Sequence, residues 1–201
     1  MKRLLAVSFF FFYIACSPSE KREGQVDRSS SNNELSTIQN NEQAENVVIN
    51  FLKWYRDNYK NIDKINLVNN SEHAIYDSTK FYSVNFEATE KYLSIFKKSG
   101  YISDKYIDQW RQYFKKCEEK FKRDPENDGP PSGFDFDLVM WSQDYDEDLA
   151  DLNKVNLSIQ KLSNYQCNVI AAFESGMKLR YSLTQVNRRW LIDDIQNNPN
   201  K

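Results

Sequence analysis

The residues with the clearest potential for chemistry lie in one acidic segment, residues 124–151. This segment holds ten acidic residues and no lysine or arginine. Hard cations such as Ca²⁺ are bound by several carboxylate oxygens, but the Asp-x-Asp-x-Asp-Gly pattern that specifies such a loop is missing. A solvated acidic loop is the simplest interpretation, and a surface that attracts a basic partner through its negative field is an alternative. The sequence therefore predicts no metal site.

Polar residues flank the apolar run Leu138-Val139-Met140-Trp141 in this segment. A carboxylate or amide in that position can line the mouth of a pocket between a sheet and helices. The alternative for Asp144 is capping of a turn or a helix start, a common role for aspartate. The candidate ligand- or partner-binding residues here are Asp135, Asp137, Trp141, Gln143 and Asp144.

Residues 176–190 have the opposite charge, with four basic residues and no acidic one. Such a hairpin can meet the acidic segment, a partner or a phospholipid head group, although a solvated strand face is the simpler interpretation. Arg180 and Trp190 complete the set of candidate binding residues. Trp190 shares a predicted strand face with Ile192, which favours a place in the core over a role in ligand stacking.

Catalytic groups are scarce. His73 is the only histidine, and it lies in a polar stretch without an associated nucleophile. The chain has only five glycines and no glycine-rich phosphate loop, so no cofactor is predicted. An enzyme that uses a pocket carboxylate such as Asp144, for instance a hydrolase or an isomerase, stays an alternative to a binding protein.

The elements that position these residues begin with helices. Apolar residues recur at helical spacing over 44–59 and 87–99, and Gly100 follows as a stop signal. The clearest helix spans 104–122, where Ser103 is a good N-cap and apolar residues form one stripe. Cys117 belongs to that stripe, which predicts a buried side chain.

Strands follow the helices. Short strands are predicted at 65–68 and 81–86, and 124–133 must be a loop because of its Pro and Gly residues. From residue 155 to 192 the pattern alternates with a period of two. Ser175-Gly176 and Asn187-Arg188 fit two-residue hairpin turns. This order predicts one α+β domain over 44–196, with N-terminal helices on one face of a curved antiparallel sheet.

The N-terminus predicts an exported protein. Lys2 and Arg3 precede a short apolar run that ends at Ala15-Cys16, and this pattern is typical of a signal peptide over residues 1–15. The run is too short to span a membrane. It resembles a bacterial lipoprotein signal in which Cys16 is lipidated, although Tyr13 stands where leucine is usual. An ordinary signal peptide cut near Ala15 is the alternative.

The polar stretch 16–43 has almost no large apolar side chains, so we expect a flexible tether there and a disordered tail over 197–201. Removal of Lys2 and Arg3 leaves 25 of the 27 basic residues against 29 acidic ones, a net charge of −4. This balance disfavours nucleic acid as a partner. With Cys16 lipidated, Cys117 and Cys167 remain as a pair that either forms a disulfide in an oxidising compartment or stays as two buried thiols.

Three short motifs suggest a family. They are Phe51-Leu52-Lys53-Trp54-Tyr55, then Asp135-Phe136-Asp137 with Gln143-Asp144, and the closing Arg189 to Ile195. Over about residues 45–196 the chain resembles uncharacterised bacterial exported proteins with a cystatin-like fold, akin to nuclear transport factor 2. The resemblance implies a curved antiparallel sheet wrapped around helices, often with a pocket, and no settled activity.

We therefore expect a lipid-anchored binding module at the outer or periplasmic membrane face of a bacterial cell envelope. Its partners would be the membrane, through the lipid, and a protein or a small-molecule ligand. A structural envelope protein without a ligand is a further alternative, and it predicts a domain without a sizeable concavity.

Overall fold

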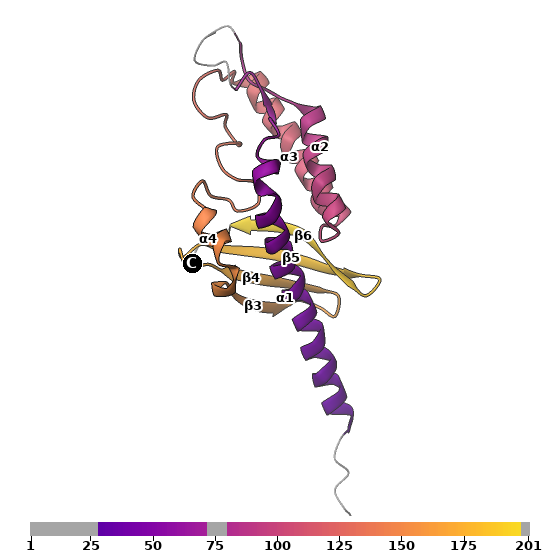
Figure 1. Cartoon of the computed structure of the whole chain (residues 1–201). Coiled ribbons are helices and arrows are strands. Elements are labelled where there is room, and N and C mark those ends of the chain that lie inside the picture. Colours follow the sequence, from indigo (N-terminus) through magenta and orange to yellow (C-terminus); the bar gives the residue numbers. More distant parts are fainter. Residues whose placement is uncertain (1–27, 72–79, 198–201) are drawn as a thin grey trace, which may run out of the picture.

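A computed structural model describes residues 28–71 and 80–197, with side chains from Glu42 onward (Figure 1). The predicted signal peptide, Cys16, His73 and residues 198–201 lie outside this part. Helices lie against an antiparallel sheet, which confirms the α+β class. The elements in chain order are α1 (Arg28–Ile62), β1 (Val68–Asn69), β2 (Ser83–Val84), α2 (Phe86–Ser99), α3 (Asp104–Arg123), α4 (Asp146–Ala150), the 3₁₀ helix η1 (Leu152–Lys154), β3 (Asn156–Lys161), β4 (Gln166–Ala172), β5 (Lys178–Val186) and β6 (Arg189–Asn197).

The main sheet is an antiparallel meander in the order β3-β4-β5-β6. The predicted alternation is confirmed, because every second residue of β4 and β5 is buried. Val169 of β4 lies opposite Tyr181 of β5 on that buried face. Helix α1 crosses this face of the sheet in Figure 1 and contacts β3, β4 and β6.

The two hairpin turns differ from each other. Asn187 and Arg188 both have positive φ, 51° and 63°, which confirms a two-residue turn of the type whose twist suits a hairpin. The β4–β5 turn is longer than predicted, because Phe173 pairs with Met177 and leaves a three-residue loop. Gly176, with φ of 90°, closes that loop in a conformation that glycine adopts without strain.

Helix α1 is longer than the sequence predicts. It begins at Arg28 instead of residue 44, so the second half of the expected tether is helical. A helix that is already fixed on the sheet extends at low cost through residues such as Glu and Gln, since only its first turn carries the nucleation penalty. Although α1 is long, no helix in the described part of the chain is apolar enough over a sufficient length to cross a membrane.

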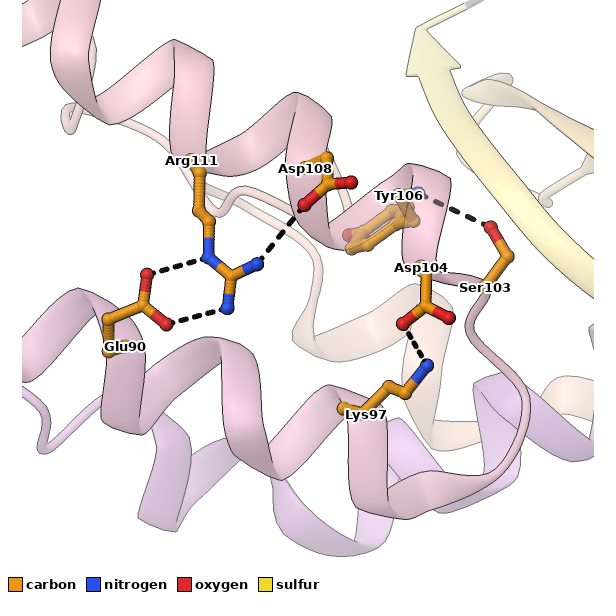
Figure 2. A network of polar contacts seen from close by, with 7 residues as sticks. All are labelled: Glu90, Lys97, Ser103, Asp104, Tyr106, Asp108 and Arg111. Atoms are coloured by element: carbon orange, nitrogen blue, oxygen red, sulfur yellow. Dashed lines mark hydrogen bonds and ion pairs between the residues drawn. The ribbon is translucent and has the colours of Figure 1, made fainter.

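Helices α2 and α3 form a pair beside the sheet, and their predicted ends are confirmed. The Ser103 side chain accepts a hydrogen bond from the Tyr106 amide at 3.3 Å, and Gly100 ends α2 with φ of 79°. Figure 2 shows how the two helices are joined at the surface. Arg111 of α3 donates two hydrogen bonds to Glu90 of α2, at 2.7 and 2.8 Å. This exposed contact links the two helices at their surface.

The two strands predicted before α2 are shorter than expected. Only Val68–Asn69 and Ser83–Val84 form a ladder, with Val68 opposite Val84. The second strand stops because the Asn85 side chain accepts a hydrogen bond from the Ala88 amide at 3.1 Å and starts α2. The two strands form a separate small sheet.

Of the two alternatives for the cysteine pair, the disulfide is not formed. Cys117 and Cys167 are both free and buried, so the alternative of two separate thiols holds. The physical reason is the packing of their elements, since α3 contacts β2 and β6 whereas β4 is covered by α1. Burial raises the pKa of the Cys117 thiol and raises that of Cys167 to about 11, which makes both thiols poor nucleophiles.

Candidate functional site

A cavity of about 500 Å³ opens where the end of α1 meets two loops. One loop, residues 63–71, follows α1, and the other belongs to the acidic segment. Helix α2 contributes Tyr92. A volume of this size suits a small molecule. The lining residues are Ile62, Asp63, Ile65, Asn66, Leu67, Val68, Ser71, Tyr92, Pro130, Pro131, Phe134, Asp135, Phe136, Asp137, Leu138, Gln143 and Tyr145.

Asp137 organises the acidic loop. Its carboxylate accepts hydrogen bonds from the amides of Val139 at 3.0 Å and Met140 at 2.6 Å, the local pattern that aspartate favours in turns. Its carbonyl accepts from the Trp141 amide at 2.8 Å. The hydroxyl of the buried Tyr55 in α1 donates a hydrogen bond to the same carboxylate. Asp137 therefore ties the loop to the helix that crosses the sheet.

The carboxylate of Asp137 is held in a partly apolar place. Burial raises its pKa above the ordinary value, and the negative charge of Asp63 raises it further. The Tyr55 hydroxyl and the amides of Met140 and Val139 oppose this effect, because they stabilise the ionised form. The charge of Asp137 in turn contributes to the raised pKa of Tyr55, after burial.

Asp63 also lines the cavity, directly after the end of α1. Its amide donates to the Tyr59 carbonyl at 2.8 Å, and its carboxylate accepts from the Tyr145 hydroxyl at 3.1 Å. Tyr59 donates to Asp146 at 2.7 Å, which ties the helix to the loop a second time. Burial raises the pKa of Asp63, the Tyr145 hydroxyl lowers it, and the charge of Asp146 adds to the increase.

Tyr92 is the most deeply buried of the polar residues that line the cavity. Its side chain is only 5% exposed, yet within residues 28–71 and 80–197 its hydroxyl makes no hydrogen bond. Burial raises its pKa well above the ordinary value, and the charges of Asp137 and Asp63 contribute. In the described part of the chain, the buried side-chain atoms without a partner belong to Tyr106, Arg180 and Tyr181, so the Tyr92 hydroxyl reaches the open space of the cavity. A ligand there would form a hydrogen bond with this hydroxyl.

Aromatic and apolar side chains form the remaining walls. Phe134 stacks on Phe114 of α3 with ring centroids 5.9 Å apart, and Phe136 stacks on Trp141 at 5.2 Å. The indole nitrogen of Trp141 donates to the Ile195 carbonyl at 3.0 Å, which fastens the acidic loop to β6. These contacts hold the walls in place without occupying the cavity.

The structure brings together only part of the predicted site. Asp135, Asp137 and Gln143 line the cavity, and Gln143 donates to the Asp135 carbonyl at 2.5 Å. Trp141 and Asp144 instead border a neighbouring depression of about 430 Å³ beside the β4–β5 turn. Arg180 bonds to Gln196 on the sheet, and Trp190 is buried beside α1.

The acidic segment does not converge on one point. Asp124 pairs with Arg123, Glu126 pairs with Lys120, and Asp148 accepts from Ser175. Within the described part of the chain, no three His, Cys, Asp or Glu side chains gather as a metal site would require. Asp144 is exposed and outside the cavity, so the hypothesis of a pocket-carboxylate enzyme loses the residue on which it was based.

Sequence reasoning missed Asp63, Tyr92 and Tyr145. One signal was available: Tyr55 and Tyr59 lie four residues apart on a predicted helix, where two hydroxyls can face one loop. No protein-family model, curated protein or solved structure matches the chain. The fold and the site define an α+β domain with a ligand-sized cavity of carboxylates, tyrosines and apolar residues.

Proposed function

We propose that this protein is a lipid-anchored binding module of a bacterial cell envelope, and that its domain holds a small-molecule ligand in the cavity between α1 and the acidic loop. One observation carries the proposal. The cavity combines a suitable volume with the carboxylate of Asp137 and with Tyr92, a mostly buried residue whose hydroxyl has no hydrogen-bond partner in the described part of the chain. The long helix on an antiparallel meander supports a cystatin-like domain for this role.

The other functions have less support. A structural envelope protein needs no concavity, and a cavity of about 500 Å³ argues against it. A carboxylate enzyme would have to use Asp63 or Asp137 instead of Asp144. Asp137 already accepts hydrogen bonds from one hydroxyl and two amides, which suits a positioning role better than proton transfer.

Two experiments test the proposal. Metabolic labelling with palmitate in a bacterial host should mark the full chain and leave Cys16→Ala unmarked. Absence of label in the unmutated protein would contradict the lipid anchor.

The cavity is tested separately, with a thermal-shift screen of small molecules against the full chain in detergent. We expect hits that Leu67→Trp loses, because Leu67 lines the cavity. Leu162→Trp is the matched control, since Leu162 is 57% exposed beyond the end of β3. Hits that survive equally in both variants would place the ligand elsewhere.

A further inference from the structure

The charge of the cavity is uniform. Asp63, Asp135 and Asp137 line it, and its lining has no Lys, Arg or His among the described residues. Other acidic residues of the same segment are neutralised locally, since Glu126 lies 3.1 Å from Lys120 and Asp151 lies 3.9 Å from Lys154. None of the three cavity carboxylates has such an ion pair within residues 28–71 and 80–197.

Asp137 is half-buried, whereas Asp63 and Asp135 are exposed, and a half-buried negative charge without a counter-charge is unfavourable. The Tyr55 and Tyr145 hydroxyls stabilise the carboxylates of Asp137 and Asp63, but they are neutral donors. A cation between the two carboxylates would neutralise the charge that these hydroxyls leave uncompensated. An anionic ligand such as a phosphate would meet repulsion from every charged residue of the lining.

The walls specify which kind of cation fits. Tyr92, Phe134, Phe136 and Tyr145 present aromatic rings to the cavity, and ammonium groups bind aromatic faces as well as carboxylates. Ile65, Leu67 and other aliphatic side chains can cover the hydrocarbon part of a ligand. The unpartnered Tyr92 hydroxyl offers a further polar contact. This mixture suits an organic cation better than a hydrated metal ion.

We propose that the cavity between Asp63, Asp137 and Tyr92 binds a small organic cation, a molecule with an amine or quaternary ammonium group and a short apolar part. This inference rests on the proposed function, because it names the class of ligand for the same cavity. It adds that charge, and not shape alone, selects the ligand.

The test compares cations with uncharged molecules of the same shape. Isothermal titration calorimetry on the full chain in detergent would use choline against 3,3-dimethyl-1-butanol, and n-butylamine against n-butanol. We expect at least one cation to bind at least about tenfold more tightly than its neutral counterpart, a difference of about 1.4 kcal/mol. In Asp63→Asn, that advantage should shrink about tenfold.

Asp144→Asn is the matched control for Asp63→Asn, because it removes one exposed carboxylate from the acidic segment outside the cavity. Tyr92→Phe keeps the ring and removes only the hydroxyl. It should weaken butylamine binding, which would show that the amine binds beside Tyr92. Neutral molecules that bind as well as the cations would overturn the charge selection but leave the proposed function intact. If none of the four molecules binds, the thermal-shift screen decides between two outcomes. Neutral or anionic hits that Leu67→Trp loses would overturn only the cation inference. The absence of any hit that Leu67→Trp loses would overturn the proposed function as well. Binding of tetralysine without binding of the small amines would identify a protein side chain as the ligand and contradict the small-molecule assignment.

Discussion

The hydrogen bond from Tyr55 to Asp137 should be a main stabilising contact of the site, and Tyr55→Phe tests it. Tyr55 is fully buried, and its ring packs against Phe51 and Phe96. The substitution keeps the ring and removes only the hydroxyl. A buried hydrogen bond to a charged group contributes roughly 1.5–3 kcal/mol, so we expect the free energy of unfolding to fall by about 2 kcal/mol at neutral pH.

The pH dependence of this loss follows from the pKa of Asp137. Its folded-state pKa is raised, so the folded state binds more protons than the unfolded state between the two pKa values. The free energy of unfolding therefore falls as pH rises through that interval. Loss of the Tyr55 hydroxyl raises the folded-state pKa further, because that bond stabilises the ionised form. The cost of Tyr55→Phe should be largest at neutral pH and smaller near about pH 4.

Urea unfolding followed by tryptophan fluorescence, between about pH 4 and pH 7.5, measures both effects. Tyr59→Phe is the matched control, since Tyr59 makes a similar bond to Asp146 at the surface. We expect a clearly smaller loss there, because solvent screens this exposed bond. Equal losses in the two variants, or a loss in Tyr55→Phe that does not change with pH, would refute the role of Asp137 as a buried, charged centre.

Three further predictions concern the scaffold. Glu90→Gln removes the ion pair with Arg111 and should cost at most about 1 kcal/mol in urea unfolding at pH 7, because the pair is exposed. Arg111 lowers the pKa of Glu90, so this contribution is present above the unfolded-state pKa and is lost as pH falls through the lowered value; a cost that grows on acidification would contradict this sign. Gly100→Ala should lower the free energy of unfolding by about 1 kcal/mol, since φ is 79° there and the nearest atom to an added Cβ is 3.8 Å away; a neutral result in thermal unfolding would mean that the turn relaxes. Cys117 and Cys167 should react with Ellman's reagent on unfolding without a reductant, and slowly in the folded protein; no reaction after unfolding would show a disulfide.

The sequence predicts the scaffold well where one local rule decides the outcome. Ser103 and Gly100 define helix ends, and alternation defines β4 and β5, because these patterns depend on neighbours in the chain. The predicted start of α1 at residue 44 was wrong, because polar residues that cannot form a core can still extend a helix. The cysteine pairing depends on which helix covers which strand, and spacing along the chain does not contain that information.

The site could be predicted only in part. Asp137 stands out beside an apolar run, but the cavity also needs Asp63 and Tyr92, which come from two other segments of the chain. Their meeting depends on how α1 and α2 dock on the acidic loop. Asp144 was predicted at the site but lies outside it. Gln143 lines the cavity, whereas the next residue, Asp144, borders the neighbouring depression.

The central claim is that the cavity holds a small molecule, and its most direct test is mass spectrometry of what the protein carries. The full chain would be purified from bacterial envelopes, denatured, and the released small molecules compared with those from Leu67→Trp and Leu162→Trp. The account predicts a cationic compound that is released by the unmutated protein and by Leu162→Trp, and that is depleted in Leu67→Trp. Equal release from all three proteins would contradict it.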